Sequence, residues 1–208
     1  MRKYLSKHSS FGFTLIEILV SIAIVSFISV AIISFRLSVL KGSASMQAGL
    51  ISQQQVRKAF YQFVQEARSA LSPTGGATLI EVATSSFTFY ANVDKDAPVE
   101  RVRYFMGTST ASTTMFYREV IEPVGGVYAH SNQELSTIIN DIRATTTAIF
   151  TYYDTNYEGT STPLVQPVTT TAVRLVKIIL PIDPNAARSP IYQVYSTQVS
   201  LRNMKDNL

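Results

Sequence analysis

The sequence predicts an α+β protein in which a long N-terminal helix precedes an antiparallel β-sheet domain. Two observations carry this prediction. Residues 13–35 form an apolar run whose only ionisable side chain is Glu17. Beyond residue 72 the chain consists of short stretches rich in Val, Phe, Tyr and Thr, separated by turn-forming residues, which is typical of successive antiparallel strands.

The apolar run is long enough to cross a membrane. At about 1.5 Å per residue, residues 13–35 span roughly 34 Å as a helix, which matches the hydrocarbon core of a bilayer. A carboxylate inside such a run costs about 2.5–3.5 kcal/mol even on the mild insertion scale, so it normally has a partner. The presence of Glu17 in this segment therefore calls for a physical reason.

The residues before Glu17 carry a motif. A short basic leader, residues 1–12, ends at Gly12, and the sequence Phe-Thr-Leu-Ile-Glu then runs from Phe13 to Glu17. This arrangement resembles the N-terminus of type IV pilin and pseudopilin precursors. The resemblance implies that prepilin peptidase cuts after Gly12, that Phe13 becomes the N-methylated N-terminus, and that Glu17 guides the subunit into a filament.

Charge considerations support the same role for Glu17. Cleavage after Gly12 would leave an α-amine on Phe13, a cation in a region that cannot hydrate it, with Glu17 one helical turn further on. If two helices pack with a small stagger, the carboxylate of one subunit neutralises the amine of its neighbour, and breaking such a buried pair costs about 3–5 kcal/mol. The alternative is that Glu17 snorkels to the headgroups and pairs with nothing.

A secretory signal peptide and a plain signal anchor fit the N-terminus less well. A signal peptide has a shorter apolar core with the cleavage site after it, whereas here the run begins after the candidate cut. A plain signal anchor gives no reason for Gly12, Phe13 and Glu17. The basic residues of the leader favour a cytoplasmic leader and an exported C-terminal domain. We therefore predict a single-pass protein of the cytoplasmic (inner) membrane that later enters a pilus or pseudopilus.

Residues 36–71 are predicted to continue the helix with an amphipathic pattern that packs on the globular domain, residues 72–208. Gly42 and Gly49 either permit a bend or are tolerated in a helix held by packing. Apolar residues recur at spacings of three and four at Met46, Leu50, Phe60, Phe63, Val64, Ala67 and Leu71.

Seven strands and one short helix are predicted in the globular domain. The helix is expected over residues 131–142, because Ser131 and Glu134 form a capping box and apolar residues then recur at helical spacing. Residues 154–170 and 181–190 are expected to be exposed loops. The strands are expected at residues 78–82, 86–93, 100–106, 114–120, 147–153, 171–180 and 191–201.

Composition argues against several classes of partner and site. The formal net charge is +4, but removing the three basic leader residues from 18 Lys+Arg leaves 15 against 14 Asp+Glu. No direct nucleic-acid partner is inferred, because no basic run with interleaved aromatics follows. The chain has no cysteine, which favours a minor subunit or pseudopilin over the major pilins, many of which resemble one another in a C-terminal disulfide loop.

The order of elements after the helix, with Tyr117-Arg118-Glu119, resembles the larger minor pilins and the J-like minor pseudopilins of type II secretion. That resemblance implies two small antiparallel sheets on a shared helix and a complex at the filament tip that primes assembly. The prediction is an assembly subunit whose partners are the membrane, prepilin peptidase and other pilin or pseudopilin subunits. The alternative is a membrane-anchored adhesive or ligand-binding β domain.

Catalysis is not predicted. His8 would leave with the leader, and His130 lies in an expected loop without nucleophile-elbow glycines, so a surface histidine is the favoured interpretation. The chain also lacks the dinucleotide-binding, P-loop and zincin motifs. Asp94 and Asp96, with Lys95 between them, are interpreted as a solvated turn.

No cofactor is predicted, although calcium is considered. Asp154, Asn156 and Glu158 place oxygen-bearing side chains at alternate positions before a glycine, a weak similarity to a calcium loop that lacks the terminal bidentate glutamate. Some pseudopilins bind calcium in loops of this kind. A plain polar loop is the alternative for these three residues, and Asp94 and Asp96 are the weaker candidates.

Overall fold

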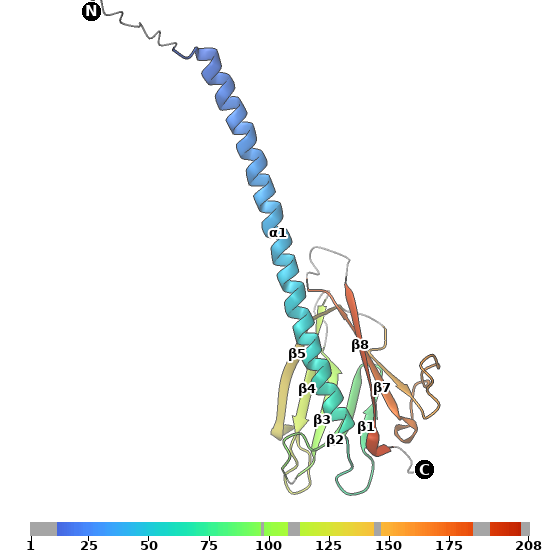
Figure 1. Cartoon of the computed structure of the whole chain (residues 1–208). Helices are drawn as coiled ribbons and strands as arrows, with labels where there is room; N and C mark the ends of the chain where they lie inside the picture. Colours follow the sequence, from blue (N-terminus) through green and yellow to red (C-terminus); the bar gives the residue numbers. More distant parts are fainter. Residues whose placement is uncertain (1–11, 97, 108–112, 144–146, 185–191, 205–208) are drawn as a thin grey trace, which may run out of the picture. The chain divides into compact units, whose positions relative to one another are not determined.

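The structure is a computed structural model that describes residues 12–96, 98–107, 113–143, 147–184 and 192–204. The chain divides into two compact units, Met1–Gln47 and Ala48–Leu208. Helix α1, Leu15–Arg68, supplies most of the described part of the first unit and begins the second (Figure 1). Every described strand belongs to the second unit, and all strand pairs are antiparallel. The predicted α+β class is confirmed.

Within the second unit, one stripe of α1 is buried against the sheet. Ser52, Val56, Ala59, Phe63 and Ala67 recur at spacings of three and four residues, and all are buried. This is the periodicity that places side chains on one face of a helix. The amphipathic pattern is confirmed for this part of the helix.

The prediction that Met46 and Leu50 belong to the buried apolar face was wrong. Met46 is 74% exposed and Leu50 is 60% exposed. Leu50 precedes Ser52 by two residues, a spacing that turns it away from the buried stripe. The helix also ends at Arg68, three residues earlier than predicted, because Leu71 already pairs with the sheet by donating its N–H to the carbonyl of Tyr90 at 2.9 Å.

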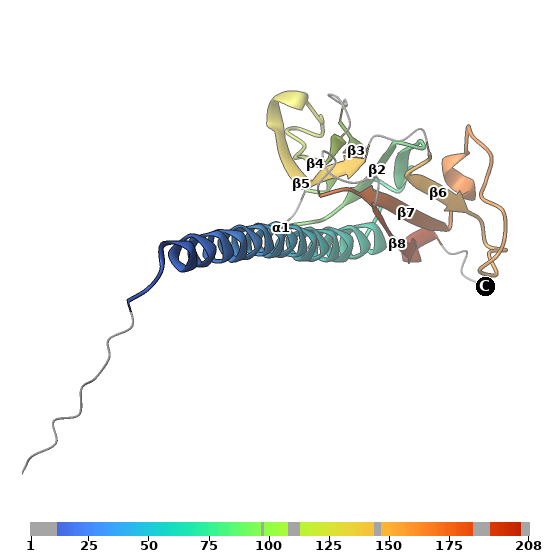
Figure 2. The same cartoon turned by 90° about the horizontal axis from the view of Figure 1, so that it is seen from above.

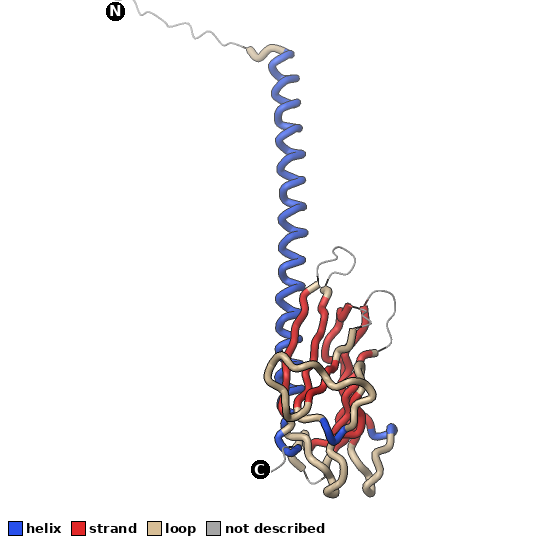
Figure 3. Tube along the Cα trace, turned by 90° about the vertical axis from the view of Figure 1, so that its right-hand side faces the viewer, coloured by secondary structure: helices blue, strands red, loops and turns tan. Residues whose placement is uncertain are grey.

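The described strands form one sheet in the order β1-β2-β3-β4-β5-β7-β6, and β8 also pairs with β7. Figure 3 shows the strands in red. Two small sheets were predicted, but the structure has one sheet made of two groups of strands, β1–β5 and β6–β8. A single residue pair, Ile142 with Ile182, joins the two groups. All seven predicted strands are present. The bounds are β1 Leu79–Val82, β2 Ser86–Ala91, β3 Glu100–Met106, β4 Thr113–Ile121, β5 Gln133–Arg143, β6 Phe150–Tyr153, β7 Leu175–Ile182 and β8 Gln193–Ser200.

Three short 3-10 helices complete the described elements: η1 His130–Asn132, η2 Thr170–Ala172 and η3 Arg202–Met204. Residues 154–170 are mostly exposed, as predicted. The prediction of a loop from residue 181 was wrong at its start, because Pro181 lies in β7 opposite Val194 of β8. Residues 185–190 of that predicted loop lie outside the described residues.

Aromatic side chains fill the core between α1 and the sheet. Phe63 of the helix is fully buried, with its ring centroid 5.2 Å from that of Tyr104 and 6.1 Å from those of Phe87 and Phe150. These rings come from β2, β3 and β6, so one helical side chain contacts both groups of strands. The helix lies along one face of the sheet in this unit (Figure 2).

The helix predicted over residues 131–142 was wrong, because this segment is strand β5. Its apolar spacing arises from two bulges. Between the pairs Tyr117–Thr137 and Phe116–Ile139, and again between Phe116–Ile139 and Thr114–Ile142, β5 has one more residue than β4. A bulge shifts the inward face by one residue and so turns a period of two into a spacing of three. Ile139 and Ile142 are therefore both buried.

The second bulge contains Asp141, and substitution of this residue tests the bulge. Asp141 has φ of 61°, a left-handed conformation that costs a residue with a Cβ atom about 1–2 kcal/mol and that β-branched side chains tolerate least. Asp141→Val should lower the free energy of unfolding by about this amount, whereas Asp141→Gly should be neutral or stabilising. Thermal unfolding checks this, with Asn140→Val as the matched exposed control. Equal effects of valine at both positions would contradict the bulge.

Candidate functional site

The residues of the N-terminal motif surround the start of α1. Thr14 caps the helix: its hydroxyl oxygen accepts the backbone N–H of Glu17 at 3.3 Å, and its carbonyl accepts the same N–H at 3.1 Å. Glu17 consequently lies in the first turn, where a carboxylate interacts favourably with the helix dipole. The Thr-x-x-Glu spacing is a capping-box signature, a local signal that could have predicted this helix start.

Gly12 and Phe13 lie outside the helix and are both exposed. A Cβ atom added at Gly12 would meet no atom within 4 Å, and Gly12 is not among the glycines with positive φ. The Phe13 side chain is 78% exposed. Nothing in the described structure therefore requires glycine at position 12.

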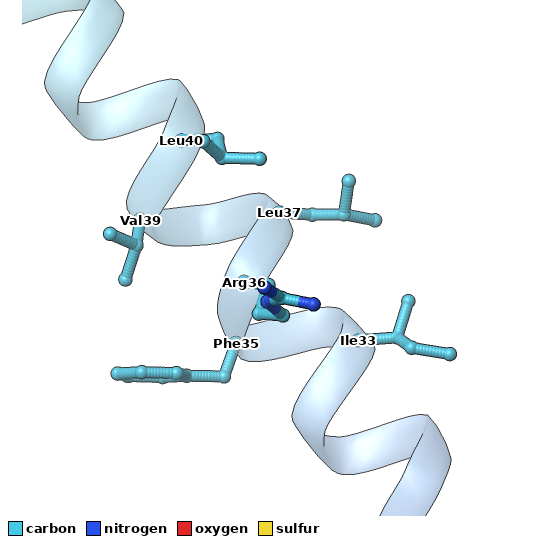
Figure 4. Close-up of a pocket in the computed structure, with 6 residues that line it drawn as sticks. All are labelled: Ile33, Phe35, Arg36, Leu37, Val39 and Leu40. Atoms are coloured by element: carbon cyan, nitrogen blue, oxygen red, sulfur yellow. The ribbon is translucent and has the colours of Figure 1, made fainter.

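The first unit presents apolar side chains on every side of its helix. Within Leu15–Ser43, an 18-residue window has a mean hydropathy of 2.7, and among the described residues this is the one helical stretch long and apolar enough to cross a membrane. Figure 4 shows Ile33, Leu37 and Leu40 projecting to one side of the helix and Phe35 and Val39 to the other, around Arg36. A helix that is apolar all round belongs in a lipid or protein environment.

Four serine hydroxyls of this helix, those of Ser21, Ser29, Ser38 and Ser43, donate to backbone carbonyls of the helix itself. Ser21 and Ser29 each donate to the carbonyl four residues earlier at 2.7 Å. Within the described residues no ion pair engages Glu17, and the sequence has no other ionisable side chain between Phe13 and Phe35. Glu17 thus has no ion-pair partner within the described chain.

A buried charged cluster joins α1 to the sheet in the second unit. The Glu66 carboxylate forms a salt bridge with the Arg118 guanidinium at 2.9 Å and accepts a hydrogen bond from the Tyr104 hydroxyl at 2.6 Å. The side chains of Arg118 and Glu66 are only 11% and 9% exposed. The cluster ties the helix to β3 and β4.

The pKa values in this cluster follow from the burial. Burial raises the pKa of the Tyr104 hydroxyl well above its usual range, and the Glu66 charge adds to the rise. Burial alone would lower the pKa of Arg118, but its hydrogen bond to Glu66 and the Glu66 charge outweigh this, and the pKa rises. Arg118 therefore stays charged and Tyr104 stays a hydrogen-bond donor.

Sequence reasoning missed Glu66. Its position was readable, because Glu66 follows Phe63 by three residues and so falls on the buried stripe of the helix. A carboxylate on that stripe requires a partner. Arg118 was noticed only as part of a family resemblance.

The sequence candidate His130 begins η1. The side chain of His130 is 71% exposed, with Nδ1 3.6 Å from Glu119 Oε1, and the neighbouring Ser131 hydroxyl bonds to Asn132. These contacts agree with a surface histidine.

The 154–158 loop is held by its own hydrogen bonds. The Asp154 carboxylate accepts the Asn156 backbone N–H at 2.9 Å and the Asn156 side-chain amide at 3.2 Å, and Glu158 donates its N–H to Ser161. Calcium binding by this loop stays a prediction.

Residues 7–33 match the family model of the prokaryotic N-terminal methylation motif. No significant match was found among curated proteins or among solved structures. The matched residues contain Gly12, Phe13 and Glu17. This match supports a type IV pilin-like precursor, a structural subunit that prepilin peptidase processes and that assembles with other pilin subunits. The apolar helix agrees with anchoring in the inner membrane.

Proposed function

We propose that this chain is a minor pilin or pseudopilin, cut after Gly12 and methylated at Phe13, that enters a type IV pilus or type II secretion-like filament through α1. Before assembly it crosses the inner membrane once, with the β domain exported. In the filament, Glu17 neutralises the α-amine of a neighbouring subunit. The absence of cysteine supports a minor subunit or pseudopilin. The resemblance to minor pilins and J-like pseudopilins supports a role in priming assembly at the tip.

The observation that carries this proposal is the position of Glu17. Thr14 caps the helix so that the carboxylate lies in the first turn, one turn after the amine that cleavage would create. The Ser21 hydroxyl, one turn further along the helix, already donates to a backbone carbonyl. A charge held without a partner in an apolar helix is suited to pair with an opposite charge on another subunit.

Gly12 supports the same proposal. Among the described residues, neither backbone conformation nor neighbouring atoms require glycine there, which agrees with a role in processing. A peptidase must bring its catalytic groups close to the peptide backbone, and a residue without a side chain allows that approach.

The test is the N-terminal mass of the protein from membranes of cells with and without prepilin peptidase. We expect a chain beginning at methylated Phe13 only when the peptidase is present. Gly12→Leu should stay uncut in both strains, whereas the matched control Gly42→Leu, another glycine with open space around it, should be cut normally. An intact Met1 in both strains would overturn the proposal.

A second candidate function is adhesion or ligand binding by the β domain. One observation favours it: the outer face of the sheet carries a half-buried aromatic pair, Phe105 and Tyr117, stacked at 5.4 Å, with the Arg103 guanidinium 4.7 Å from the Phe105 centroid. Met115 beside them is 44% exposed. Flat aromatic surfaces of this kind suit contact with another molecule. Binding through this face should survive substitution of Glu17.

A further inference from the structure

The chain between β2 and β3 gathers three carboxylates that the N-terminal motif does not use. One carboxylate oxygen from each of Asp94, Asp96 and Glu100 lies within 4.8 Å of the other two. Asp94 and Asp96 are exposed, whereas Glu100, the first residue of β3, is only 1% exposed. The sequence showed the first two as a solvated turn, and only the fold adds the buried third carboxylate.

Glu100 has an oxygen without a partner. Its Oε2 accepts the backbone N–H of Val93 at 2.8 Å, but its buried Oε1 has no hydrogen-bond partner among the described residues. A buried carboxylate oxygen in this state is costly, and native structures rarely leave one unsatisfied. A bound ion would satisfy such an atom.

Asn92, directly after β2, provides a second oxygen of the same kind. Its side-chain nitrogen donates to the carbonyl of Asp96 at 2.6 Å, which orients the amide, while Oδ1 is buried and unpartnered within the described chain. Asn92, Asp94 and Asp96 thus place oxygen-bearing side chains at alternate positions, and Glu100 follows.

The carboxylates in this turn repel one another. Burial raises the pKa of Glu100, and the charges of Asp94 and Asp96 raise it further against the opposing backbone hydrogen bonds. Partial desolvation also raises the pKa of Asp96, with contributions from Asp94 and from the Glu122 charge. For both groups the neighbouring charges that shift the pKa are other carboxylates. A cation among these oxygens would relieve the repulsion.

We propose that this turn binds a calcium ion through the carboxylates of Asp94, Asp96 and Glu100 and the amide oxygen of Asn92. Carboxylate and amide oxygens are ligands for hard divalent cations. Calcium suits this set better than magnesium, because it accepts six to eight oxygens in irregular geometry, with water completing the shell. The open turn and the small number of protein ligands predict a dissociation constant on the order of 10⁻⁴–10⁻³ M, as in extracellular calcium modules. The proposal holds whether or not the chain forms filaments.

The test is thermal unfolding of the full-length protein in detergent micelles, with calcium or with a chelator. Calcium should raise the melting temperature of the wild type by a few degrees, because a ligand that binds only the folded state stabilises it. Glu100→Gln should remove this shift. In chelator, the same variant should melt no lower than the wild type, since it replaces a buried unpaired charge by a neutral group of the same shape.

Two further variants and a second metal ion test whether these residues bind calcium. Asp96→Asn, at an exposed position where misfolding is not expected, should also weaken the calcium shift, whereas the matched control Asp154→Asn should retain it. An absent shift in the wild type, or a full shift in Glu100→Gln, would overturn the site. A shift lost in Asp154→Asn would move the site to the other loop, and an equal shift with magnesium would overturn the choice of calcium.

Discussion

Replacing Glu17 by leucine should keep the protein out of filaments while leaving its membrane insertion, its cleavage and its β domain unchanged. The substitution removes a charge that costs about 2.5–3.5 kcal/mol inside a membrane, so any effect on membrane insertion should be favourable. In the filament the same change leaves the α-amine of a neighbour buried and unpaired, at about 3–5 kcal/mol. Incorporation should therefore fall by at least about a hundredfold.

The measurement is the ratio of protein in sheared filaments to protein in membranes, read by immunoblot from cells that express the rest of the machinery. Ser21→Leu is the matched control, because it makes a similar apolar change one turn along the helix and loses only an internal hydrogen bond. Glu17→Asp keeps the charge on a shorter side chain and should retain part of the incorporation. Normal incorporation of Glu17→Leu would contradict the pairing of Glu17 with a neighbour's amine.

Replacing Arg118 by methionine should have the largest effect on the stability of the β domain. The change leaves Glu66 charged and buried without its ion-pair partner, which costs about 3–5 kcal/mol. For a chain of this size, the melting temperature should fall on the order of 10 °C. Near-ultraviolet circular dichroism of the buried tyrosines reports the transition, because Tyr104 lies in the same cluster.

Two further variants separate the ion pair from general packing. Arg103→Met removes an Arg whose pair with Glu81 is longer, at 3.7 Å, and more exposed, so it should cost only about 1 kcal/mol. The double variant Glu66→Leu with Arg118→Met should recover much of the loss, since no buried charge then remains unpaired. If the double variant were as unstable as Arg118→Met alone, the unpaired charge of Glu66 would not be the cause of the lost stability.

The sequence by itself determined the parts of this protein whose signals are local. The apolar run and the motif from Gly12 to Glu17 were readable because each depends on residues adjacent in the chain. The positions of seven strands were readable for the same reason, because β-branched and aromatic residues between turn formers mark them. Their ends were less accurate, since pairing partners decide where a strand stops.

Only the tertiary structure decided which residues far apart in sequence meet. It made residues 133–143 a strand, because pairing with β4 absorbs two bulges that in the sequence imitate a helical period. It brought Glu66 to Arg118 and Glu100 to Asp94 and Asp96. A charge becomes a binding group or an ion-pair partner when burial removes water from it, and burial depends on which strands and helices cover it.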